Sequence, residues 1–121
     1  MGLFKKKESA GCRAWHYEGI PGFAQDMPCE IDIQDDKVVF KQNDSVVNLP
    51  ISKIQSCEFV KETQYMGKYH NNPVDTCKVK GGVKWFTVIH YDDKQIGLWS
   101  LDSKPYDYVK GVVPSPREIT L

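Results

Sequence analysis

Residues 61–84 gather basic side chains around two tyrosines. This segment holds five lysines but only two acidic residues, Glu62 and Asp75, so three positive charges are in excess. Such a surface suits an anionic partner, because lysines pair with anionic groups while tyrosine rings stack on planar ones. The candidate binding residues are Lys61, Tyr65, Lys68, Tyr69, Lys78, Lys80 and Lys84. The competing interpretation is a solvated hairpin tip without a ligand.

The first ten residues form a second basic cluster. Two apolar residues precede three consecutive lysines: Leu3, Phe4, Lys5, Lys6 and Lys7. Near an anionic bilayer each lysine adds about 1 kcal/mol of attraction, which makes this segment a candidate membrane contact. The competing interpretation is a flexible lead, since chain termini are commonly disordered.

Four cysteines and three histidines are the candidates for metal or nucleophilic chemistry. Cys12 and His16 have a spacing that a metal site could use, but no two cysteines show the short spacing of a zinc motif. A cysteine nucleophile needs a lowered thiol pKa and a nearby base. We expect free thiols, with Cys29 and Cys57 buried in strands, and neither a metal nor another cofactor. A metal- or thiol-dependent enzyme is kept as the least favoured alternative.

Composition limits the class of partner. The chain has 121 residues, the length of one domain, and its 16 basic and 16 acidic residues balance. No global field favours a nucleic acid, so we expect none as a partner. No apolar run approaches the roughly twenty residues of a membrane span, and the N-terminus lacks the apolar core of a signal peptide. A cytoplasmic location is therefore expected, with peripheral membrane association as an addition to it.

A β-hairpin over residues 83–101 is the element that the sequence defines best. Both of its strands are rich in β-branched and aromatic residues. A two-residue loop at Asp92-Asp93 would set the register of the hairpin. That register pairs Ile89 with Ile96 and Phe86 with Trp99, which are the cross-strand contacts that stabilise a sheet.

The rest of the chain reads as short strands separated by turn residues. Strands are expected over 12–20, 29–34, 37–41, 45–49 and 55–61, with a single turn over 51–54. The glycine, asparagine and proline content of 62–75 predicts a long loop, followed by a returning strand over 76–80. A short helix is expected from Ser103 or Lys104, with Pro105 at its first position and Gly111 as its stop.

Several of these stretches resemble bacterial pleckstrin-homology-like (PH-like, GRAM-like) domains. Residues 28–40 and 47–56 look like their opening strands, 88–101 like a later hairpin, and 105–111 like their closing helix. The resemblance covers residues 12–111. It implies a bent antiparallel sheet, partly closed as a barrel and plugged by a C-terminal helix. It also implies binding of phospholipid head groups, peptides or proteins rather than catalysis, and some bacterial relatives assemble into rings.

One departure from that family bears on the ligand. Eukaryotic lipid-binding members carry a basic cluster on the first hairpin, whereas this hairpin is acidic, with Glu30, Asp32, Asp35 and Asp36. We therefore expect an all-β domain over 11–112, with an extended tail over 113–121, that works as a non-catalytic binding or scaffold domain. Its protein or peptide partner would contact a sheet edge or the 61–84 segment. Binding to an anionic membrane surface is the first alternative, and self-association stays open.

Overall fold

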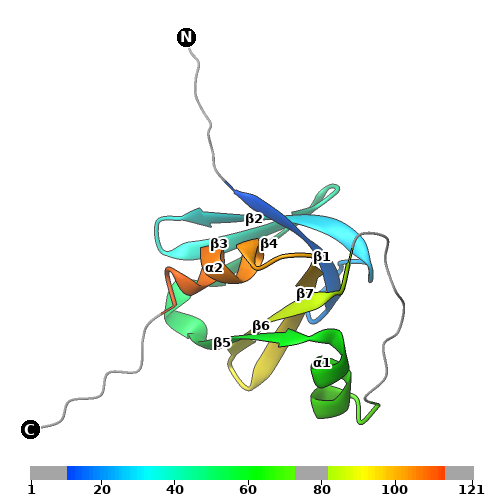
Figure 1. Cartoon of the computed structure of the whole chain (residues 1–121). Coiled ribbons are helices and arrows are strands. Elements are labelled where there is room, and N and C mark those ends of the chain that lie inside the picture. The colour runs from blue at the N-terminus through cyan, green and yellow to red at the C-terminus, as the bar shows by residue number, and fades with distance from the viewer. Residues whose placement is uncertain (1–10, 73–81, 114–121) are drawn as a thin grey trace, which may run out of the picture.

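Seven antiparallel strands form one bent sheet in a computed structural model, which describes residues 11–72 and 82–113 (Figure 1). The strands are β1 (Cys12–Glu18), β2 (Met27–Gln34), β3 (Lys37–Gln42), β4 (Ser45–Pro50), β5 (Ile54–Lys61), β6 (Trp85–Tyr91) and β7 (Lys94–Ser100). Their order across the sheet is β4-β3-β2-β1-β7-β6-β5, so β4 and β5 are its edges and the sheet is not closed. The expected all-β class is confirmed.

The tight turns of the sheet rest on aspartate and asparagine. Asp35, Asn43, Asp92 and Asp93 all have positive φ angles, a conformation that these short polar residues tolerate better than most. At Asp92-Asp93 both turn residues are left-handed, which matches the twist of the flanking strands. The predicted register of the β6–β7 hairpin is confirmed, with Ile89 opposite Ile96 and Phe86 opposite Trp99.

Alternation along the strands gives the sheet an apolar layer on each face. The inner face holds the larger core, which includes Ala14, Ile31, Phe40, Ile89 and Leu98. A second core lies against the outer face of β1, β6 and β7. It consists of Phe86, Val88 and Trp99 from the strands and of Tyr65 and Met66 from the segment that follows β5. The central hairpin is thus covered on both faces, which is why neither of its strands has a polar side.

A short helix closes the inner core at the C-terminal end of the domain. Helix α2 (Lys104–Lys110) packs against β1 and β5 and lies between the two halves of the bent sheet (Figure 1). Pro105 is in its first turn and Gly111 is its C-cap, as predicted. The single turn predicted after β4 is also present, as the 3₁₀ helix η2 (Ile51–Lys53).

The prediction of a long loop after β5 was wrong. Residues Glu62–Tyr69 form helix α1, which packs on the outer face of the sheet through Tyr65 and Met66. Gly67 is a poor helix former, but burial of an apolar helix face outweighs such a preference. The helix stops near Asn71, whose φ is +53°. The strand predicted over 76–80, the lead over 1–10 and residues 114–121 of the predicted tail lie outside the described residues.

Candidate functional site

The predicted binding residues do not form one surface. Tyr65 is fully buried, stacks on Phe86 with ring centroids 4.2 Å apart, and donates a hydrogen bond to Glu18. The side chains of Lys84 and Glu62 are each only 2% exposed, and Lys84 Nζ lies 3.8 Å from Glu62 Oε2. These groups stabilise the contact between α1 and the sheet. The other residues proposed from the sequence for ligand or membrane contact, Lys78, Lys80, Leu3, Phe4, Lys5, Lys6 and Lys7, lie outside the described residues.

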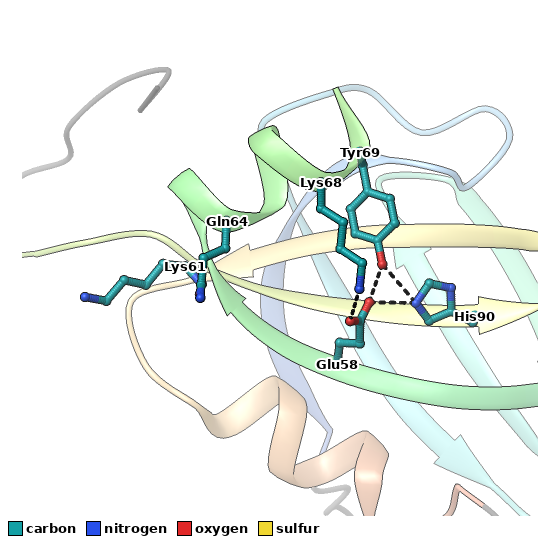
Figure 2. Close-up of polar contacts among 6 residues, drawn as sticks. All are labelled: Glu58, Lys61, Gln64, Lys68, Tyr69 and His90. Carbon is teal, nitrogen blue, oxygen red and sulfur yellow. Dashed lines mark hydrogen bonds and ion pairs between the residues drawn. The ribbon is translucent and has the colours of Figure 1, made fainter. Parts of the chain in front are cut away.

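Lys68 and Tyr69 belong to a polar cluster centred on Glu58 (Figure 2). Lys68 Nζ donates to Glu58 Oε2 at 2.7 Å, and the Tyr69 hydroxyl donates to Glu58 Oε1. Glu58 Oε1 also lies 2.8 Å from Nε2 of His90 on the neighbouring strand. The cluster therefore joins the last turn of α1 to β5 and β6.

The protonation of Glu58 decides what this cluster can do chemically. Burial opposes its ionisation, but the hydrogen bonds from Lys68, Tyr69 and His90 outweigh burial and lower the pKa of Glu58 to about 2. A general base works best with a pKa near the working pH, so this carboxylate is a weak base. It acts as a permanent hydrogen-bond acceptor, which places the proton of His90 on Nε2.

The described cysteine thiols are at least partly buried, and the imidazole of His16 is engaged in hydrogen bonds. Burial raises the pKa of the Cys12 thiol to about 11 and the pKa values of Cys29 and Cys57 to about 12, which disfavours the reactive thiolate. Both ring nitrogens of His16 bond to the backbone, Nδ1 to Ala24 O at 3.0 Å and Nε2 to Ile20 N at 3.1 Å. Within residues 11–72 and 82–113, no three His, Cys, Asp or Glu side chains are grouped so that they could hold a metal ion.

A different surface is built from three aromatic rings that belong to neither core. Phe59 stacks on Trp85, with centroids 4.8 Å apart and planes 8° from parallel, and Phe59 also meets Tyr106 of α2 at 5.3 Å. All three rings are half-exposed. Strand alternation explains their position, because Phe59 and Lys61 share the face of β5 opposite to Glu58, and Lys61 pairs with Trp85 on β6.

Two lysines extend this row of rings at its ends. Lys61 Nζ lies 5.6 Å from the centre of the Trp85 ring, and Lys110 Nζ lies 5.4 Å from the centre of the Tyr106 ring. Both side chains are exposed, and neither has a carboxylate within ion-pair distance in the part of the chain that the structure describes. Figure 2 shows the Lys61 side chain extending away from the Glu58 cluster. We call Phe59, Lys61, Trp85, Tyr106 and Lys110 the aromatic–lysine surface.

Sequence reasoning found only one member of this surface, Lys61. Alternation along the predicted strand 55–61 puts Phe59 on the same side as Lys61, but the ring that Phe59 contacts depends on the register between β5 and β6. Those strands are separated by the segment 62–84, in which no helix was expected, so the register could not be set. Tyr106 and Lys110 lie four residues apart on the predicted helix, a spacing that puts both on one helical face.

None of the protein-family models, curated proteins or solved structures compared with this chain gives a match. Among the described residues there is no helix whose length and hydrophobicity would let it cross a bilayer.

Proposed function

We propose that this chain is a non-catalytic, cytoplasmic binding domain of the pleckstrin-homology-like type, which holds a protein segment on its aromatic–lysine surface. The observation that carries the proposal is a row of three half-exposed rings outside both cores, in which Phe59 contacts Trp85 on one side and Tyr106 on the other, with an exposed lysine at each end. Tryptophan and tyrosine side chains supply much of the binding energy at protein interfaces.

The position of this surface supports a peptide or protein partner. It includes Phe59 and Lys61 of β5, which is an edge strand of the sheet formed by the described residues, and an extended segment can pair with such an edge. Its three rings are half-exposed. Half-exposed rings beside a strand suit a linear segment better than a small molecule, which favours an enclosed pocket.

A non-catalytic role is supported by the protonation and the hydrogen bonding of the side chains that could otherwise perform catalysis. Glu58 is held ionised by three donors, and the described thiols have raised pKa values. His16 uses both ring nitrogens to fix the backbone. These groups stabilise the fold, and none combines a nucleophile with a free base.

Selection of displayed random peptides on the purified protein tests this proposal. We expect enriched sequences whose binding is lost when Trp85 is replaced by Ser or Tyr106 by Ser, and kept when the half-exposed Tyr91 at the far end of β6 is replaced by Ser. Circular dichroism checks that each variant folds. Absence of any enriched peptide, or enrichment indifferent to both ring substitutions, would overturn the proposal.

A further inference from the structure

We infer that the segment bound by the aromatic–lysine surface is acidic, with one carboxylate for Lys61, one for Lys110, and apolar residues between them. This inference rests on the proposed function and adds the chemical class of the partner. It follows from the charge of the surface, from the spacing of its cations and from the rings between them.

Lys61 and Lys110 differ in their ion pairing from several other lysines in the described parts of the chain. Lys68 pairs with Glu58, Lys53 with Asp92, and Lys84 with Glu62. Lys61 and Lys110 have no such carboxylate among the described residues; each lies against an aromatic ring, and both side chains are exposed. A cation over a ring keeps its capacity for an anion, so both ammonium groups are available to a partner.

The distance between the two lysines sets the length of the partner. Four successive contacts of 4.8–5.6 Å connect the two ammonium nitrogens through Trp85, Phe59 and Tyr106. An extended segment of about six residues is long enough to follow that path from one end to the other. The two anionic groups therefore belong near the ends of such a segment, and the side chains between them face three rings.

The surroundings favour a narrow segment over an anionic membrane. Helix α2 and the turn before it also expose Asp102 and Asp107. A linear peptide that follows the rings contacts the two lysines and leaves these carboxylates in water. A planar anionic surface that reaches Lys110 also comes close to Asp107 on the same helix, and the two negative charges repel each other.

Two displayed libraries test the inference. Each carries four randomised positions between two fixed flanking pairs, Asp-Glu in one library and the uncharged Asn-Gln in the other. We expect enrichment from the acidic library alone. For the enriched peptides, anisotropy titrations should show at least a tenfold rise in Kd when NaCl increases from 50 to 400 mM, because the contacts are ionic.

Charge reversal locates those contacts. The double variant Lys61→Glu/Lys110→Glu should weaken binding at least tenfold, and peptides with Lys in place of the flanking acids should bind this variant better than they bind the wild type. Lys94→Glu is the matched control: Lys94 is exposed, has no ion-pair partner among the described residues, and lies roughly 20 Å along the β6–β7 hairpin from Trp85. It should leave Kd unchanged.

The outcomes separate this inference from the proposed function. If both libraries give equal enrichment at the rings, a peptide-binding domain stands but its acidic partner does not. If neither library binds, the proposed function itself fails. A third outcome is that phosphatidylserine vesicles bind the wild type and not the Lys61→Glu/Lys110→Glu variant, while no acidic peptide binds the wild type. The surface then contacts membranes, and the inference is overturned.

Discussion

At the scale of single residues, Glu58 shows that a cluster of side chains typical of an active site can instead stabilise the fold. A carboxylate, a histidine, a tyrosine and a lysine within hydrogen-bonding distance resemble a catalytic centre. The donors converge on one acceptor, however, and the pKa of Glu58 falls to about 2. The same residues hold α1 against the sheet, so their removal should affect stability before any other property.

The substitution Glu58→Gln should lower the free energy of unfolding by about 1–2 kcal/mol at pH 7, since hydrogen bonds to a charged group are lost. Because the folded pKa is depressed, the contribution of Glu58 is complete above about pH 4.5 and is lost as the pH falls toward 2. The gap between wild type and variant in urea unfolding should therefore narrow below pH 4.5.

Glu30→Gln is the control, because Glu30 is 63% exposed and reaches Arg13 only at 4.0 Å. It should change stability by less than about 0.5 kcal/mol. Equal losses in the two variants would show that the Glu58 cluster contributes no more than a surface pair.

His16 gives a second pH dependence at this scale. Burial lowers its pKa below the ordinary 6.5, and this outweighs the backbone bond to Ala24 and the nearby carboxylates of Glu18 and Asp26, which raise it. Protonation would also cost the bond that Nε2 accepts from Ile20. The contribution of His16 should be complete above pH 6.5 and decline as the pH falls below it.

Urea unfolding between pH 7.5 and 5 measures this decline, and His16→Gln should flatten that part of the profile. NMR titration of the imidazole gives the midpoint directly. A midpoint for His16 above 6.5 in the folded protein would contradict the expected direction.

At the scale of elements, helix α1 is held by a close fit between Tyr65 and β7. A Cβ atom on Gly97 would lie 2.5 Å from the Tyr65 hydroxyl oxygen and 3.0 Å from Cζ. Glycine is therefore required at this point of the strand for the helix to reach the sheet. The fit also explains why Tyr65 is buried rather than part of a basic binding surface.

Gly97→Ala should destabilise the domain by about 1–3 kcal/mol, because an overpacked core forces side chains or backbone to move. Adding Tyr65→Phe removes the nearest atom and should recover part of that loss. Thermal unfolding of both variants checks this, with Gly111→Ala as control, since its new Cβ would meet nothing closer than 3.5 Å. If the Gly97→Ala variant is as stable as the control, Tyr65 does not pack against Gly97 as described.

The elements differ in how far the sequence could predict them. The hairpin of β6 and β7 was predictable because its loop is two residues long and its cross-strand pairs are apolar. Helix α2 was predictable from Pro105 and Gly111. Helix α1 was not, since Gly67 and the neighbouring asparagines favour turns and only packing on the sheet makes the helix stable. The aromatic–lysine surface depends on that helix, because α1 lies within the connection that brings Trp85 beside Lys61.

At the scale of the whole molecule, the protein is an open sheet with a core on each face, and the polar clusters described above are engaged in holding its elements together. The Glu58 cluster and the Lys84–Glu62 pair are used to attach α1. The aromatic–lysine surface, by contrast, combines rings outside both cores with cations that lack an anionic partner among the described residues. These half-exposed rings and exposed lysines are the groups that support a binding role.

The most direct test of that role is to map where a selected peptide contacts the protein. Two-dimensional ¹⁵N NMR spectra of the labelled full chain, recorded during titration with the tightest peptide, report every amide at once. We predict that the largest shifts follow Phe59, Lys61, Trp85, Tyr106 and Lys110, with small shifts on β2 and β3. Largest shifts on the outer face of β2 and β3, with the aromatic–lysine surface unchanged, would contradict this assignment.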